Sequence, residues 1–364
     1  MAEALELEQL NPYEVPLDEI DVSRAELMQA DAHWDYFARL RKEAPVHKGV
    51  SPLFGEYWSI TKFEDIMAME RNHQMFSSDK GIILADRPED FSTPNFIGMD
   101  PPKHGPLRRA VITRFTSRML EQLEPQVRDI ARGIMRDARD TGEVNFVESL
   151  AGDLPTAVIG SLLEIPSDMW PQIRQWSDLQ TSASDPDLGG TTEQVNQASV
   201  EMGTYGYQLA SERKDQGGDD LISLLINQEV DGEKVSEMEF ASLFIQITVA
   251  GNETTRGLIS SGMHELIRKP ELYRQLEANP EQLPAAIEEM LRWTCPLHYF
   301  RRTATRDTEI RGQAIREGDR VVMLYSSANF DEEVFEQPMN FDIRRDPNPH
   351  LAFGHGIHLC LGAN

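Results

Sequence analysis

Apolar residues recur every three to four positions through most of the chain between residues 104 and 290. The pattern is clear at 117–139, where Leu123 and Val127 are among the apolar positions, and it predicts an amphipathic helix. Alternating apolar and polar residues near 45–61 predict short paired strands. We therefore expect a mainly α protein with small β portions, in the α+β class.

A long helix is predicted from Ser236, because Ser236 and Glu239 have the spacing of a capping box and no proline follows before Pro270. Such a helix has about 33 residues and is roughly 50 Å long. Its centre, residues 250–255, is polar and contains glycine. Polar groups in a buried helix are costly unless they are satisfied or used. The residues alone leave two interpretations open: a local opening of the helix beside a cofactor, or a polar stripe that faces solvent.

Other segments lack a helical period. Residues 81–102 are rich in proline and predict a long loop, a kind of segment that usually has a function in a compact domain. Glycine and aspartate at 185–192 predict a mobile loop between helices. We also expect an irregular arm at 1–20, a helix at 284–293, and strands within 307–329, separated by a turn at 317–319.

Composition narrows the class of protein. Of the 364 residues, 40% are hydrophobic and 26% charged, as in a folded globular chain. The net charge of −26 disfavours nucleic-acid binding, which needs basic groups to neutralise phosphates. The acidic N-terminus is unlike a signal peptide, and no run of about 18 apolar residues predicts a membrane span. Two cysteines make no disulfide framework, so we expect a cytoplasmic protein with no membrane partner.

Candidate chemistry is concentrated at the end of the chain, in residues 353–362. Three glycines there permit tight turns and close approach to a flat ligand, and a Cys360 thiolate could bind haem iron. Backbone N–H groups of the loop could stabilise the charge on that sulfur. Two alternatives stay open: a zinc site that includes His355 and His358, for which no further ligand pattern is present, and a buried structural thiol.

The same loop resembles the cysteine-ligand signature of the cytochrome P-450 family, which matches at Phe353, Gly356, His358, Cys360 and Gly362. The resemblance implies a single haem-thiolate monooxygenase domain, 1–364, of the bacterial soluble type. It implies a triangular helical fold with heme b between a long central helix and the Cys-ligand helix. Cys360 is then the iron ligand, with Phe353, Gly354 and Gly362 against the cofactor.

Residues 250–255 resemble the family's oxygen-activation motif, in which an acid precedes a threonine. The reaction then uses O2 as co-substrate and needs protons before the bond between the two oxygen atoms breaks. The resemblance implies that Thr254 holds a hydrogen-bonded water or an oxygen atom and that Glu253 relays protons from solvent, as a positioned general acid. Ala250 is expected beside the haem.

Four residues resemble those that bind the haem propionates in this family. His104 and Arg108 lie one helical turn apart in the sequence, and Arg302 resembles a strand arginine. His358 is expected to act with them, and Arg301 is a second candidate. Arginine suits carboxylates because its guanidinium donates in a fork.

Glu289 and Arg292 resemble the family's Glu-x-x-Arg pair, for which the resemblance implies a buried structural role linked to the segment before the Cys loop. As an isolated i, i+3 pair they would be unremarkable on a helix surface.

The substrate pocket implied by the family is apolar and favours a small hydrophobic substrate such as a sterol side chain, a branched lipid or a terpenoid. Ordinary core packing is the alternative for each of its residues. We expect its walls to include Ile82, Ile83, Leu84, Phe96, Ile97, Ile247, Val249, Leu297 and Phe300.

These observations predict a monomeric monooxygenase that inserts one oxygen atom into a C–H bond. No flavin or nicotinamide fingerprint is present, so electrons are expected from an iron–sulfur ferredoxin and its NAD(P)H-dependent reductase. Alternatives are a peroxide-driven peroxygenase and a non-catalytic haem-binding protein. Family members usually continue past the Cys loop with a helix and a strand pair. This sequence ends at Asn364, so we expect either that its C-terminal segment is truncated or that the protein lacks that helix.

Overall fold

The computed structural model divides into two compact units. The first unit combines Met1–Asp90 with Ser261–Cys360, and the second combines Phe91–Ser260 with Leu361–Asn364. The residues that the structure describes are 11–86, 96–112, 117–182, 185, 189–216, 218, 221–230 and 232–363.

A five-stranded sheet organises the first unit, in the order β1-β2-β9-β6-β3. Only the β2–β9 pair is parallel, and the predicted strands near 45–61 are confirmed as the β1–β2 hairpin, in which Val46 pairs with Ile60. The sheet strands are β1 Val46–Ser51, β2 Gly55–Ile60, β3 Phe76–Ser77, β6 Tyr299–Ala304 and β9 Arg320–Leu324.

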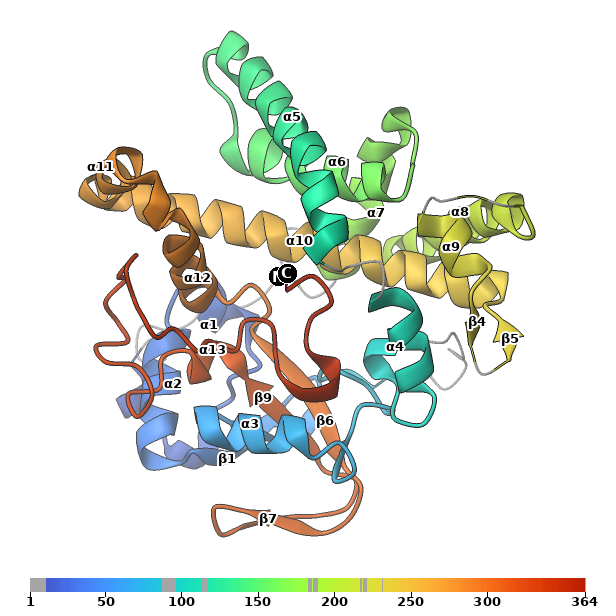
Figure 1. The fold of residues 1–364 in the computed structure, drawn as a ribbon. Helices are drawn as coiled ribbons and strands as arrows, with labels where there is room; N and C mark the ends of the chain where they lie inside the picture. Colours follow the sequence, from blue (N-terminus) through green and yellow to red (C-terminus); the bar gives the residue numbers. More distant parts are fainter. Residues whose placement is uncertain are drawn as a thin grey trace. The chain divides into compact units, whose positions relative to one another are not determined.

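Apolar side chains of helix α3 (Phe63–Arg71) pack on this sheet. Ile66 and Met69 share a buried cluster with Val321 and Met323 of β9, and Figure 1 shows α3 beside the sheet. The other helices of the unit are α1 Ala25–Gln29, α2 His33–Glu43, α11 Pro270–Ala278, α12 Leu283–Thr294 and α13 Tyr325–Ala328.

The structure confirms only part of the strands predicted within 307–329. Strands β7 (Thr308–Ile310) and β8 (Gln313–Ile315) form a separate hairpin, and β9 follows as expected. Residues 325–328, however, form the short helix α13 and are not a strand. The reason is tertiary: all four side chains are buried, and the Ser327 hydroxyl donates to the Thr61 carbonyl at 3.0 Å.

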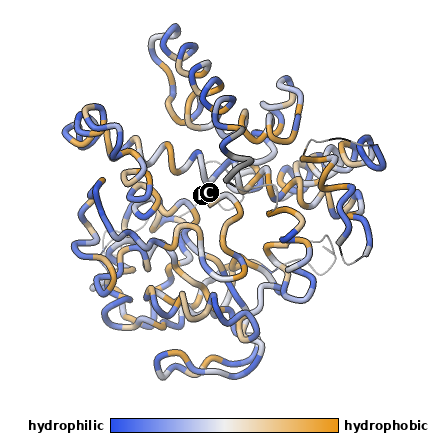
Figure 2. The backbone as a smooth tube through the Cα atoms, viewed as in Figure 1, coloured by the Kyte–Doolittle hydropathy of each residue, from blue (hydrophilic) through white to orange (hydrophobic). Residues whose placement is uncertain are grey.

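The second unit is mainly helical around one large core. The predicted helix at 117–139 is confirmed as α5, and Figure 2 shows apolar residues recurring along it among hydrophilic ones. The predicted loop at 185–192 falls between α7 and α8, with residues 183–184 and 186–188 outside the described part. The elements are α4 His104–Ile112, α5 Ser117–Thr141, α6 Asp153–Leu162, α7 Trp170–Thr181, α8 Thr192–Arg213, α9 Leu221–Ile226, β4 Glu229–Val230, β5 Glu233–Lys234 and α10 Glu237–Arg268. Residues 261–268 of α10 belong to the first unit.

Helix α10 confirms the predicted long helix and its start. Ser236 N–H donates to the Glu239 carboxylate at 2.9 Å, and Glu239 N–H donates back to the Ser236 hydroxyl at 3.2 Å. The helix continues through 250–255 without the opening considered from the sequence. Within it, the Thr254 hydroxyl donates to the Ala250 carbonyl. Among the described helices, none combines the length and apolar character needed to cross a bilayer.

Candidate haem-thiolate site

The loop that carries Cys360 is closed by its own backbone. Cys360 N–H donates to the Phe353 carbonyl at 3.0 Å, around a single 3-10 turn at Gly356–His358. Gly354 and Gly356 have φ values of 66° and 70°, a left-handed conformation that side chains disfavour. The Cys360 side chain is exposed. An accessible thiol beside a tightly turned glycine backbone fits the requirements of a haem-iron ligand.

Cys295 does not share these properties. It is fully buried at the end of α12, and its thiol contacts the Leu297 carbonyl at 3.4 Å. Burial raises the pKa of this thiol, which disfavours the thiolate that a metal ligand requires. Of the two cysteines, only Cys360 is therefore suited to bind iron.

Gly356 fits against the last turn of α3. A Cβ atom at this position would lie 2.3 Å from the Glu70 carbonyl oxygen, well inside normal contact. Nearby, Arg71 Nε donates to His355 Nε2 at 3.2 Å, and Ser78 Oγ lies 3.2 Å from His358 Nε2. These contacts tie the Cys loop to the sheet side of the first unit.

We expect Gly356→Ala to displace the Cys loop, because the new methyl group would meet backbone and the left-handed φ adds strain of about 1–3 kcal/mol. The haem-to-protein ratio of the purified enzyme should fall well below that of the unchanged chain. Gly318→Ala is the matched control, since Gly318 also has positive φ but no atom within 4 Å of the added carbon. Equal haem content in the two variants would contradict the close-packing argument.

The zinc alternative finds no ligand set among the residues that the structure describes. Within the described ranges, no group of three or more histidine, cysteine, aspartate or glutamate side chains is arranged to hold a metal ion. His355 and His358 instead contact Arg71 and Ser78.

Two consecutive arginines of β6 point to different surroundings. Arg302, 3% exposed, donates through Nη2 to Glu70 Oε2 at 3.3 Å, and the Tyr325 hydroxyl donates to the other oxygen of the same carboxylate. Arg301, also buried, turns instead to the backbone of residues 83–85. The two arginines therefore have different partners, which the sequence alone could not show. Arg302 faces α3, and Arg301 faces residues 83–85.

Glu70 is a residue that sequence reasoning missed. It lies 232 positions before Arg302 and belongs to no recognisable motif, yet both members of the pair are almost fully buried. A buried arginine needs a partner or it carries an uncompensated charge. Glu70 supplies that partner and orients the guanidinium.

In the second unit, His104 and Arg108 lie one turn apart on α4, as the sequence predicts. His104 is buried and Arg108 is half-buried. Their predicted role toward a propionate stays a prediction.

Glu253 of α10 is half-buried within a network of charged side chains. Arg256 donates to the Glu253 carboxylate and also, at 2.8 Å, to Asp178 of α7. On the other side, Asn252 donates to Glu253 at 3.3 Å and accepts from the Thr156 hydroxyl at 2.8 Å. Burial first, and then Asp178, raise the pKa of Glu253 to about 7, while Arg256 opposes the rise.

The geometry therefore gives Glu253 a carboxyl group that changes protonation near neutral pH. A group with such a pKa can both accept and donate protons at pH 7. The i, i+3 spacing of Glu253 and Arg256 is visible in the sequence, whereas no sequence pattern links Glu253 to Asp178, which lies 75 positions earlier (253 minus 178).

The predicted pocket residues fall into several apolar clusters. Phe96 and Ile247 are buried in the core of the second unit, with Ile97 and Val249 packed against it. In the first unit, Leu84 is buried in one cluster, and Leu297 and Phe300 pack against another. Ile83 is 52% exposed. Their predicted contact with a substrate stays a prediction, as does the alternative of core packing.

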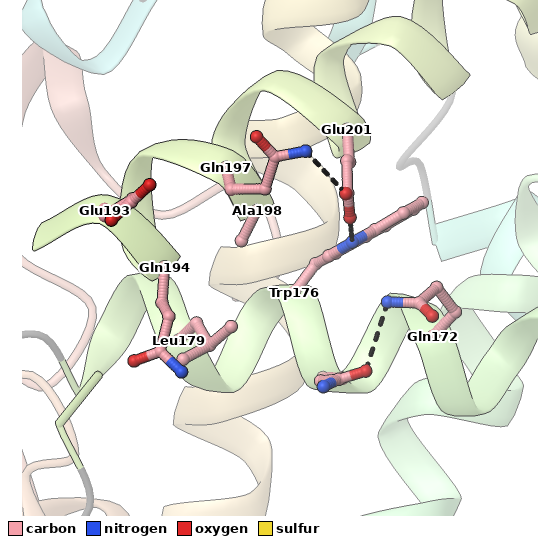
Figure 3. Close-up of a pocket in the computed structure, with 9 residues that line it drawn as sticks. Gln172, Trp176, Leu179, Glu193, Gln194, Gln197, Ala198 and Glu201 are labelled. Carbon is pink, nitrogen blue, oxygen red and sulfur yellow. Dashed lines mark hydrogen bonds between the residues drawn. The ribbon is translucent and has the colours of Figure 1, made fainter. Parts of the chain in front are cut away.

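A separate groove of about 440 Å³ lies between α7 and α8 (Figure 3). Some of its polar groups bond to one another: the Trp176 indole N–H donates to Glu201 at 2.8 Å, and Gln197 donates to the same carboxylate at 2.7 Å. None of the predicted pocket residues is among its described lining residues, which are Gln172, Gln175, Trp176, Leu179, Glu193, Gln194, Gln197, Ala198 and Glu201.

Comparison with known proteins supports one family. The profile described as "Cytochrome P450" matches residues 196–364. The chain is similar to the methyl-branched lipid omega-hydroxylase of Mycobacterium tuberculosis, with 37% identity over 97% of this chain and 86% of that protein. It is also similar to the steroid C26-monooxygenase of Rhodococcus jostii, with 38% identity over 90% of this chain and 72% of that protein.

A solved structure gives the same result for the fold. Cytochrome P450 CYP268A2 of Mycobacterium marinum, in complex with pseudoionone, matches with a TM-score of 0.86 and 33% identity, over 96% of this chain and 89% of that one. The predicted fold class and the predicted resemblance are confirmed. The chain therefore belongs to the cytochrome P450 family of haem-thiolate monooxygenases, which bind haem b and use O2.

Proposed function

We propose that this cytochrome P450 hydroxylates a methyl-branched lipid or the side chain of a steroid. The observation that carries the proposal is the accessible Cys360 thiol on its glycine-turned loop, in a chain 37–38% identical to enzymes named for those two substrate classes. A terpenoid is a third substrate class, since the similar solved structure is described in complex with pseudoionone.

The residues present fit a haem. We propose that Cys360 binds the iron, while Arg302, His358, His104 and Arg108 bind the propionates. Bound haem supplies the activation of O2 that no amino-acid side chain provides. A thiolate at Cys360 would tune that chemistry as the iron ligand. Phe353, Gly354, Gly362 and Ala250 are proposed to contact the ring.

Glu253 and Thr254 are proposed to deliver protons. Glu253 takes a proton from solvent through its half-buried carboxyl group, whose pKa of about 7 suits the exchange. Thr254 presents its hydroxyl from the next position of the same helix; its own proton goes to the Ala250 carbonyl at 2.7 Å, which leaves the oxygen able to accept from a water.

The substrate pocket and the electron donor complete the proposal. Apolar side chains at Ile82, Ile83, Phe96, Val249 and Phe300 suit a hydrocarbon and do not suit a sugar or nucleotide.

Electrons are proposed to come from an iron–sulfur ferredoxin and its NAD(P)H-dependent reductase. The enzyme is proposed to act in the cytoplasm as a monomer.

Removing the negative charge of Asp178 and removing the positive charge of Arg256 should shift the pH dependence of turnover in opposite directions. If turnover needs the protonated carboxyl, it falls as the pH rises through about 7. Asp178→Asn removes a neighbouring negative charge, lowers the pKa of Glu253 and moves this fall to lower pH. Arg256→Leu removes the opposing positive charge and moves it to higher pH. Glu253→Gln should reduce turnover by about 100-fold or more.

These variants are compared by product formation between pH 5 and 9, with consumption of NAD(P)H measured in parallel. Glu193→Gln, an exposed acid on α8, serves as the control and should leave the profile in place. Shifts of the same sign for Asp178→Asn and Arg256→Leu would contradict the assigned role of Glu253.

The substrate class is tested by reconstituting the enzyme with a surrogate ferredoxin and reductase. A methyl-branched fatty acid, a cholestane-type steroid and an acyclic terpenoid are each added, and hydroxylated products are identified. Turnover only with hydrogen peroxide would favour the peroxygenase alternative. Haem binding without product from any donor would favour a non-catalytic protein.

A further inference from the structure

Arg301 makes an unusual set of contacts with the start of the proline-rich loop. Its backbone N–H donates to the Ile82 carbonyl at 2.7 Å. Its Nη1 lies 3.0 Å from the Leu84 carbonyl and 2.8 Å from the Asp86 carboxylate, with the carbonyls of residues 83 and 85 at 3.3 and 3.4 Å. Arg301 therefore contacts every residue from 82 to 86: Ile82 through its main chain, the carbonyls of 83–85 through its side chain, and the Asp86 carboxylate.

Asp86 is shared by a second arginine. Arg320 of β9 donates to the other oxygen of the Asp86 carboxylate and to the Phe54 carbonyl. Burial alone would raise the pKa of Asp86, but the hydrogen bonds from Arg301 and Arg320 outweigh it and the pKa is lowered. Asp86 is therefore charged at neutral pH and binds both arginines.

The contacts fix one path for the backbone. The Arg301 side chain is 2% exposed, so breaking its contacts would leave a buried charge without acceptors. With 82–86 held in this way, Leu84 is directed into the core of the first unit, and Ile83 is left 52% exposed. Tyr299 adds a weak contact, at 3.5 Å from Leu84 N.

We propose that Arg301 and Asp86 form a latch that positions Ile82 and Ile83 and thereby determines which C–H bond of the substrate is hydroxylated. Arg301 is a positioning residue, since it acts through the loop. The proposal rests on the proposed function, in which these isoleucines contact a hydrophobic substrate. It assigns Arg301 a role other than binding a propionate.

The test uses the haem-loaded full chain. Asp86→Asn removes the charge, and Arg301→Lys keeps the charge but loses the forked geometry. The control variants are Asp307→Asn and Arg316→Lys, because these two residues form an exposed ion pair of the same kind, at 2.8 Å, beside the β7–β8 hairpin. Asp86 is 57% exposed, so Asp86→Asn is expected to fold even if Arg301→Lys does not.

The first readout is amide hydrogen exchange at Arg301, whose N–H donates to the Ile82 carbonyl, and at Leu84, whose N–H contacts the Tyr299 hydroxyl. The latch predicts an increase of roughly tenfold or more in both latch variants and none in the controls. Exchange that stays at the control level in Asp86→Asn would overturn the latch, whatever the enzyme's activity.

The second readout is the distribution of hydroxylated products from a steroid or branched fatty acid. We expect latch variants to keep the haem and the red-shifted Soret band of the reduced carbon monoxide complex, to spread product over several carbons, and to raise KM more than they lower kcat. An unchanged product distribution alongside faster exchange would overturn the specificity role. Loss of the Soret band in the unchanged protein would instead contradict the proposed function.

Discussion

Replacing Cys360 by serine is expected to abolish both the red-shifted Soret band of the reduced carbon monoxide complex and product formation. The band requires a thiolate bound to iron, and a serine hydroxyl is not deprotonated under the same conditions. Haem is expected to remain in part, because the propionate contacts and the apolar surroundings do not depend on the sulfur. The measurement is a reduced carbon monoxide difference spectrum with quantified haem.

Cys295→Ala is the matched control for this experiment. It removes the only other thiol of the chain, one that is buried and whose raised pKa disfavours the thiolate. Cys295→Ala removes a buried sulfur atom and so lowers the stability of the protein somewhat. The variant should keep the red-shifted Soret band. A band that survives Cys360→Ser, or that disappears in Cys295→Ala with haem still bound, would reverse the assignment of the ligand.

Glu289→Ala is expected to destabilise the protein by about 3–5 kcal/mol, because it leaves a buried arginine without its partner. Both Glu289 and Arg292 are fully buried, and Arg292 donates two hydrogen bonds to the carboxylate, each at 2.8 Å. The same carboxylate accepts from Arg345 Nε at 3.0 Å and from Asp342 N–H at 2.9 Å. Its loss would therefore release the segment near 342–348 as well.

The change is measured as the midpoint of thermal unfolding and as the yield of folded, haem-containing protein. The control is Asp129→Ala, from an exposed pair with the same i, i+3 spacing on α5, which should change little. The double variant Glu289→Leu with Arg292→Met should be less destabilised than Glu289→Ala, since it removes both charges. A Glu289→Ala midpoint equal to that of the control would contradict a buried structural pair.

What the sequence predicted well was local. The capping box at Ser236, the helix that contains Glu289 and Arg292, and the β1–β2 hairpin depend on neighbouring residues, and the structure confirms each. The Cys loop was recognised through its resemblance to a family signature whose glycine and cysteine positions lie within ten residues, whereas its spacing alone left a zinc site and a structural thiol open.

What could not be predicted depends on residues far apart in the chain. Glu70 meets Arg302, and Asp178 modifies the pKa of Glu253, through contacts that no periodicity encodes. The helix at 325–328 replaced an expected strand because burial against Thr61 outweighed local preference. The sequence could also not tell which arginine of the β6 pair faces α3, since that depends on register.

The alternation of Arg301 and Arg302 limits how this part of the chain can change in length. In the β6–β9 pairing, Arg301 lies opposite Val322 and Arg302 opposite Val321, and successive side chains emerge on opposite faces. Inserting or deleting a single residue ahead of this pair would exchange the two guanidiniums, leaving Glu70 and Asp86 each with the wrong neighbour. Point substitutions can be absorbed one at a time, whereas a one-residue change of length would damage both arrangements at once. Related sequences and engineered variants should therefore tolerate insertions here only in steps of two.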